Sequence, residues 1–173
     1  YKYIKVAYNH PDKEYLSARL SINSTYVEIL QSLASAAITK NKHKEFASYY
    51  SELLSIFKAY PDINVSTFLE DDFIVGTFSA MLKSGYNKAE IYKNIDLLAQ
   101  LRHESMVQFD SYNYELNDGI AVITRFWGEN ALNANNPEIA RLFFDYAYEW
   151  SYKVDLSDDI LTNICDWYAY YYQ

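Results

Sequence analysis

Apolar residues recur at steps of three and four along almost the whole chain, and this helical period constrains the fold more than any other feature of the sequence. The segment 42–60 shows it clearly, with Phe46, Tyr50 and Leu53 on one stripe before Pro61 ends the pattern. The 4 Gly and 3 Pro among 173 residues are too few for the turns of an all-β sandwich or barrel. The sequence therefore predicts an all-α fold.

Helix-start signals divide the chain into seven or eight expected helices. Capping-box patterns begin at Thr25, Thr67 and Asn87, and Asn136 before Pro137 marks a further start. With the remaining signals, helices are expected to begin near 11, 25, 42, 67, 88, 111, 137 and 158. The first eight residues fit either a short strand or the tail of an upstream helix.

From the start near 25 onward, alternate starts recur every 42 to 49 residues, as antiparallel helical hairpins joined by short loops do. This spacing favours a solenoid-like stack of HEAT or armadillo type, but no residue pattern repeats with it. An irregular closed bundle gives the same spacing, so both arrangements stay open. With no linker in the sequence, we expect residues 1–173 to form a single helical domain. Because the chain begins with Tyr1 and not Met, we expect a fragment of a longer chain or a processed product.

The net charge is −8 and is unevenly distributed. Residues 1–87 carry 9 basic and 9 acidic side chains, whereas residues 88–173 carry 6 basic and 14 acidic ones. Proteins that bind nucleic acids normally have the opposite sign, because neutralised phosphates supply much of their affinity. The charge therefore disfavours nucleic acid and favours a basic or amphipathic protein or peptide partner.

Cysteine usage and hydropathy favour an intracellular protein. The single cysteine, Cys165, cannot form an internal disulfide, and no apolar run reaches the roughly 18 residues of a membrane span. No signal peptide is visible. Asn23 and Asn64 begin N-glycosylation patterns, but both fit helix-start chemistry better in a chain this rich in Asn, Ser and Thr.

Patterns typical of catalytic or metal sites are missing from the sequence. His10, His43 and His103 lie on separate segments, and none has a second ligand at metal-site spacing. The acidic pairs 71–72 and 158–159 fall in the first turns of expected helices, where negative charge complements the helix dipole. We therefore expect neither an enzyme nor a metal or other cofactor.

Aromatic residues give the strongest functional signal. The chain contains 19 tyrosines, many of them late in the sequence. Tyrosine and tryptophan are enriched at interfaces because they combine contact area with a polar group. A coding bias that enriches Tyr, Asn, Ile and Lys together is the competing explanation. Read as an interface, the C-terminal half offers four candidate binding residues: Arg125, Trp127, Tyr148 and Tyr152.

No motif in the sequence points to a known family. The combined pattern favours a non-catalytic scaffold or adaptor that binds a protein or peptide through an acidic, tyrosine-rich C-terminal surface. Two alternatives remain open: an RNA-binding helical repeat protein and a ligand-sensing regulatory domain of helical-repeat type.

Overall fold

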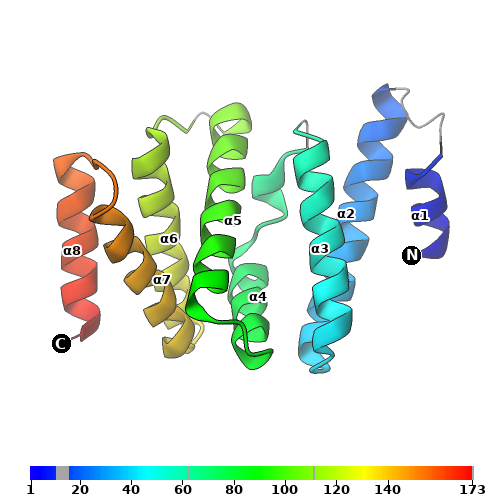
Figure 1. Cartoon of the computed structure of the whole chain (residues 1–173). Coiled ribbons are helices and arrows are strands. Elements are labelled where there is room, and N and C mark those ends of the chain that lie inside the picture. The colour runs from blue at the N-terminus through cyan, green and yellow to red at the C-terminus, as the bar shows by residue number, and fades with distance from the viewer. Residues whose placement is uncertain (11–15, 62, 111, 173) are drawn as a thin grey trace. The chain divides into compact units, whose positions relative to one another are not determined.

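In the computed structural model, the described residues are 1–10, 16–61, 63–110 and 112–172. They form eight α-helices and one short 3-10 helix, and none of them lies in a strand (Figure 1). The predicted all-α fold of seven or eight helices is confirmed. The chain divides into two compact units, Tyr1–Phe68 (unit 1) and Leu69–Gln173 (unit 2). The single domain over 1–173, the solenoid-like stack and the closed bundle stay predictions.

Unit 1 contains α1 (Lys2–Tyr8), α2 (Leu16–Thr39), α3 (His43–Ala59) and the 3-10 helix η2 (Val65–Thr67). The long helices α2 and α3 form an antiparallel hairpin, and α1 packs on α2 (Figure 1). At the turn, Asn41 adopts a φ of 53°, a left-handed conformation that asparagine tolerates better than most residues. The hairpin buries Tyr26, Val27, Leu30, Ala34, Phe46, Leu53, Ile56 and Phe57.

The N-terminal helices differ from the sequence prediction. The first residues form helix α1, so the short strand considered for them is wrong. Helix α2 runs without a break through Thr25, and the capping-box pattern there begins no helix. The physical reason is that residues 16–39 contain neither Gly nor Pro, so nothing interrupts the helix. The helix opening predicted at 11–14 lies outside the described residues.

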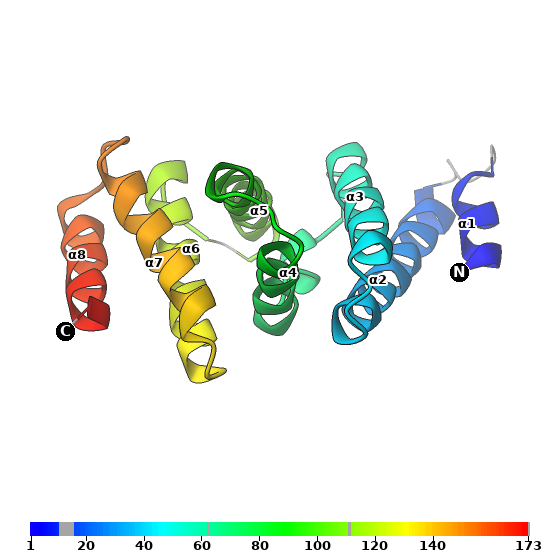
Figure 2. The same cartoon turned by 60° about the horizontal axis from the view of Figure 1, so that its bottom comes forward.

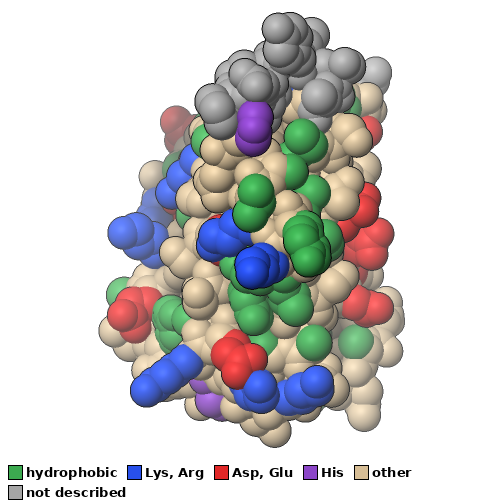
Figure 3. Space-filling model, turned by 90° about the vertical axis from the view of Figure 1, so that its right-hand side faces the viewer, with side chains coloured by type: hydrophobic (Ala, Val, Ile, Leu, Met, Phe, Trp, Pro, Cys, Tyr) green, Lys and Arg blue, Asp and Glu red, His purple; other side chains and the backbone are tan. Residues whose placement is uncertain are grey.

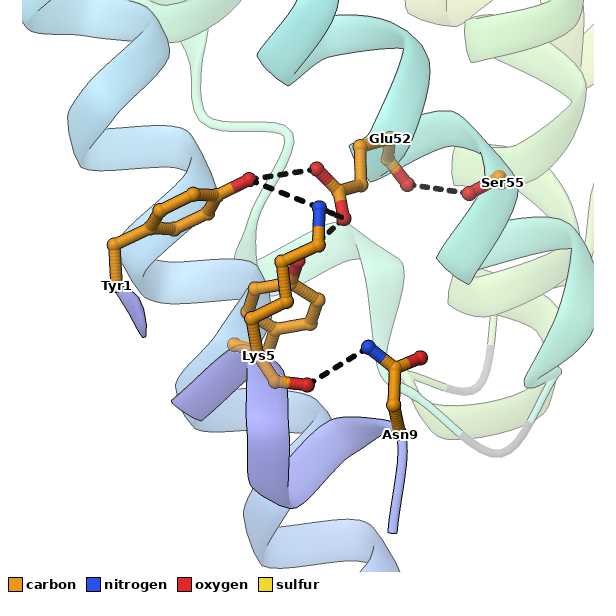
Figure 4. Close-up of polar contacts among 6 residues, drawn as sticks. Tyr1, Lys5, Asn9, Glu52 and Ser55 are labelled. Carbon is orange, nitrogen blue, oxygen red and sulfur yellow. Dashed lines mark hydrogen bonds and ion pairs between the residues drawn. The ribbon is translucent and has the colours of Figure 1, made fainter. Parts of the chain in front are cut away.

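Polar contacts help to hold helix α1 on the rest of unit 1, since none of its residues is fully buried. The Glu52 carboxylate of α3 accepts hydrogen bonds from the hydroxyls of Tyr1, at 2.9 Å, and Tyr26, and pairs with the Lys5 ammonium at 2.8 Å (Figure 4). The Tyr8 ring adds a contact with the Tyr26 ring at a centroid distance of 4.7 Å. Burial pushes the pKa of Glu52 upward, but the hydrogen bonds from Lys5, Tyr26 and Tyr1 hold it below its usual value.

Glu52→Gln is expected to loosen α1 by about 1–3 kcal/mol, because the charge-assisted hydrogen bonds at Glu52 are lost. Since folding lowers the pKa of Glu52, its contribution is present above about pH 4.5 and is lost as the pH falls through its folded pKa. Amide hydrogen exchange at Lys5–Asn9 measures this. In the wild type, protection relative to an unfolded peptide at the same pH should fall on acidification below about pH 4.5, whereas in the variant it should already be low at neutral pH. Equal protection of the two proteins at neutral pH would contradict this role.

The outer side of α1 is partly apolar. Tyr3 is 88% exposed and Val6 is 62% exposed, and Lys2 beside them is exposed as well. Figure 3 shows apolar side chains together with lysine and arginine side chains on this face of unit 1. Acidic side chains are also visible on this face (Figure 3).

Unit 2 contains α4 (Asp71–Lys83), α5 (Lys88–Phe109), α6 (Leu116–Asn133), α7 (Pro137–Ser151) and α8 (Asp158–Tyr172). Helix α6 is its centre: it packs most extensively against α7 and also contacts α4, α5 and α8 (Figure 2). Two glycines allow these close contacts. A Cβ on Gly119 would collide with the His103 ring, and one on Gly128 would lie 2.6 Å from the Phe144 ring.

The starts of these helices follow the sequence in most places. Asn87 forms the predicted capping box with Glu90, and the Asn136 side chain caps α7 ahead of Pro137. The capping-box pattern at Thr67 does not begin an α-helix. Thr67 lies in the 3-10 helix η2, and α4 begins at Asp71 with Glu70 as its N-cap. Helix α6 begins at 116 and not near 111, after a segment in which the Tyr114 carbonyl is paired with the buried His103 ring at 2.9 Å.

Candidate binding surface

Helix α7 has two apolar stripes that differ in their exposure to solvent. The stripe that contains Ile139, Phe143 and Tyr146 is buried. The second stripe begins at Phe144, which is buried, passes through a half-buried Tyr148 and ends at Tyr152, just after the helix, which is 74% exposed. Helix α8 packs on α7 (Figure 2) and covers the first part of this stripe through ring contacts with Phe144. Its last part remains open to solvent.

Four tyrosines form a continuous run of ring contacts between α7 and α8. Tyr148 stacks on Tyr168 with centroids 4.0 Å apart and planes inclined by 11°. Tyr152 meets Tyr148 edge-on at 5.0 Å, and Tyr172 lies 4.6 Å from Tyr168. We call Tyr152, Tyr148, Tyr168 and Tyr172 the tyrosine ladder. Since residues four apart lie on one side of a helix, the two pairs 148/152 and 168/172 come together where the helices meet.

Two members of the ladder, Tyr148 and Tyr172, have a raised pKa. The hydroxyls of Tyr148 and Tyr152 are 2.7 Å apart, and this hydrogen bond is the main cause that raises the pKa of Tyr148 to about 12. Burial, followed by the hydrogen bond to Asp145, raises the pKa of Tyr172. Tyr148 and Tyr172 therefore present neutral hydroxyls, which can donate and accept hydrogen bonds.

Charged side chains border the ladder on α7. The Tyr172 hydroxyl donates to the Asp145 carboxylate, and the Arg141 guanidinium lies 5.6 Å from the centre of the Tyr172 ring. Glu149 pairs with Lys88 at 2.5 Å, a hydrogen bond that holds the pKa of Glu149 below its usual value. Asp145 and Glu149 therefore both have partners already, so the border of the ladder is acidic but partly paired.

Arg125 lies at the contact between α6 and α8. Its guanidinium pairs with Glu129, lies 4.2 Å from the centre of the Phe126 ring and lies 5.8 Å from that of Trp167. Burial lowers the pKa of Arg125 from its usual value. None of these partners belongs to the ladder, so the structure does not bring Arg125 together with Tyr148 and Tyr152.

Trp127 belongs to the core of unit 2. It is 1% exposed, and its ring lies 5.5 Å from that of Phe143 and 5.9 Å from the Arg102 guanidinium. The sequence showed a signal for this position, since Trp127 continues the apolar stripe of Ile120 and Ile123. A ring this deep stabilises the fold and offers no surface to a partner in this conformation.

Two ladder members, Tyr168 and Tyr172, were not among the candidate binding residues from the sequence. Their spacing by four residues on one helix was the signal that could have found them. Beside the ladder, α8 also presents Tyr170, 69% exposed and in edge-on contact with Trp167.

The described residues contain no metal site at this surface. Among them, no group of three His, Cys, Asp or Glu side chains is placed to hold a metal ion. Within the same part of the chain, no helix is both long and apolar enough to cross a membrane.

Comparison with known proteins adds no relative: no family model, no curated protein and no solved structure matches this chain.

Proposed function

We propose that this chain is a non-catalytic protein- or peptide-binding module, a scaffold or adaptor, whose contact surface is the tyrosine ladder. The observation that carries the proposal is the exposure of aromatic side chains at the end of α7 and on α8: Tyr152 is 74% exposed and Tyr172 43%. Tyrosine supplies a large contact area with little loss of side-chain entropy, which is why it is common in binding surfaces.

The expected partner is basic, or amphipathic with a basic side. Unit 2 carries 7 Lys and Arg against 17 Asp and Glu, so its net charge is −10, whereas unit 1 carries 8 against 6. Acidic side chains around a neutral aromatic surface steer a basic partner and disfavour an acidic one. The rings then supply most of the affinity.

Selection of a displayed random peptide library on the full chain tests the proposal. Selected peptides should be enriched in Lys or Arg together with apolar residues, and a parallel selection on the Tyr152→Ala variant should lose them. Binding should weaken only moderately as salt is raised, since buried rings and not ion pairs hold the complex. Equal enrichment on both proteins, or enrichment of acidic peptides, would contradict the proposal.

Two other functions remain as alternatives. An RNA-binding role would need a basic surface, and only unit 1 has a net positive charge, of +2 from its 8 Lys and Arg against 6 Asp and Glu. A ligand-sensing role is favoured by one observation, a hollow on unit 2 that is lined in part by Arg102. The intracellular location is also part of the proposal and rests on the single cysteine.

A further inference from the structure

A hollow of about 270 Å³ opens on unit 2 beside α5 and α6, away from the ladder residues. Its size is just below the roughly 300–1,000 Å³ of sites for drug-sized molecules, so it suits a small ligand. Its wall combines charged, hydroxyl and apolar side chains. The lining includes Asp71, Arg102, Met106, Tyr112, Ile123 and Phe126.

Two lining side chains carry buried donors that have no hydrogen-bond partner among the described residues: Arg102 Nε and Tyr112 Oη. Buried polar groups are nearly always paired in native proteins, so an unpaired one calls for a physical explanation. Tyr112 is a hydroxyl donor at neutral pH, because burial raises its pKa to about 12. Two further buried donors without a partner, Arg125 Nε and Trp127 Nε1, lie on α6, and the Trp127 ring is 5.9 Å from the Arg102 guanidinium.

Arg102 retains binding capacity. Its Nη1 donates to the Leu69 carbonyl at 2.9 Å but lies 3.4 Å from Asp71 Oδ1, which is longer than the roughly 2.7–2.9 Å of a strong charge-assisted hydrogen bond. Guanidinium has five N–H donors and a geometry that matches a carboxylate. The Asp71 side chain is 43% exposed, so its carboxylate can accept a further hydrogen bond.

The hollow therefore offers a cation and a hydroxyl donor, a carboxylate close to them, and an apolar wall. A ligand with only a negative group would meet Asp71 and the net charge of −10 in this unit. A zwitterion avoids this repulsion, because its two charges face opposite partners and its net charge is zero. We propose that this hollow binds a free α-amino acid with an apolar side chain. Its carboxylate accepts from Arg102 and Tyr112, its ammonium donates to Asp71, and its side chain packs on Met106 and Phe126.

Calorimetric titration of the full chain with L-phenylalanine and with L-leucine tests this proposal. At least one of them should bind and raise the melting temperature. Two analogues of phenylalanine serve as ligand controls: phenethylamine lacks the carboxylate and 3-phenylpropionate lacks the ammonium. Each should bind at least about tenfold more weakly, because one charged contact is lost and its protein partner stays unpaired.

Variants test the individual contacts. Tyr112→Phe removes only the hydroxyl, and Asp71→Asn removes only the charge; each should weaken binding of the better amino acid by about tenfold. Tyr114→Phe is the matched control, because Tyr114 is 45% exposed and does not line the hollow, and it should leave the affinity unchanged.

The proposal is overturned if neither amino acid binds, if 3-phenylpropionate binds as tightly as phenylalanine, or if Tyr112→Phe binds like the wild type. It does not depend on the tyrosine ladder. The Tyr148→Ala/Tyr152→Ala double variant should bind the amino acid with unchanged affinity, so failure of one proposal leaves the other testable.

Discussion

Trp127→Ala is expected to destabilise unit 2 by about 3–5 kcal/mol, a large part of the roughly 5–15 kcal/mol that stabilises a typical domain. The ring is 1% exposed and contacts Phe143, which is itself fully buried, so its removal leaves a cavity that the surrounding helices cannot fill. Urea denaturation followed by amide hydrogen exchange within α6 and α7 measures the effect on unit 2 alone.

Tyr152→Ala is the matched control for this variant, since it removes a large aromatic ring from an exposed position. It should change the free energy of unfolding by no more than about 0.5 kcal/mol. A loss of less than about 1 kcal/mol for Trp127→Ala would contradict the assignment of Trp127 to the core. In that case, Trp127 would again be a candidate for contact with a partner.

The Tyr148→Ala/Tyr152→Ala double variant is expected to weaken binding of a peptide selected on the wild type by about 30-fold or more. One tyrosine at the centre of an interface contributes about 2 kcal/mol, and because 1.4 kcal/mol corresponds to a factor of ten, its loss alone weakens binding by about 30-fold. Unit 2 should remain folded, because the change removes the stacking of Tyr148 on Tyr168, worth about 0.5–1.5 kcal/mol, and little buried area.

Fluorescence anisotropy of the labelled peptide gives the affinity, and urea denaturation gives the stability of the same variant. Tyr3→Ala is the control, because Tyr3 is 88% exposed but belongs to α1 in unit 1. If the double variant unfolds, the two rings are part of the core and the proposed surface is wrong. If it binds the peptide like the wild type, the contact lies elsewhere.

Local periodicity predicted most of the fold because helix formation and helix capping depend on neighbours in sequence. The Asn87 capping box and the Asn136 cap were correct, since both occur where the chain leaves one helix for the next. The same pattern at Thr25 was wrong because residues on either side of it favour helix as strongly. A capping pattern therefore indicates a helix start only where the preceding residues stop a helix.

The candidate site depended on contacts that periodicity cannot supply. The aromatic C-terminal half predicted Tyr148 and Tyr152, but Tyr168, the stacking partner of Tyr148, comes from another helix. Trp127 continued an apolar stripe, and its burial follows from α6 being surrounded by four other helices. The hollow at Arg102 could not be predicted, because its polar wall joins α4, α5 and the segment before α6.

Amide hydrogen exchange of the full chain, with and without a selected basic peptide, tests the central proposal most directly. Exchange should slow in Pro137–Ser151 and Asp158–Tyr172, the helices that carry the tyrosine ladder, and should stay unchanged in unit 1. Protection confined to α1–α3, or no protection in α7 and α8 at saturating peptide, would contradict it.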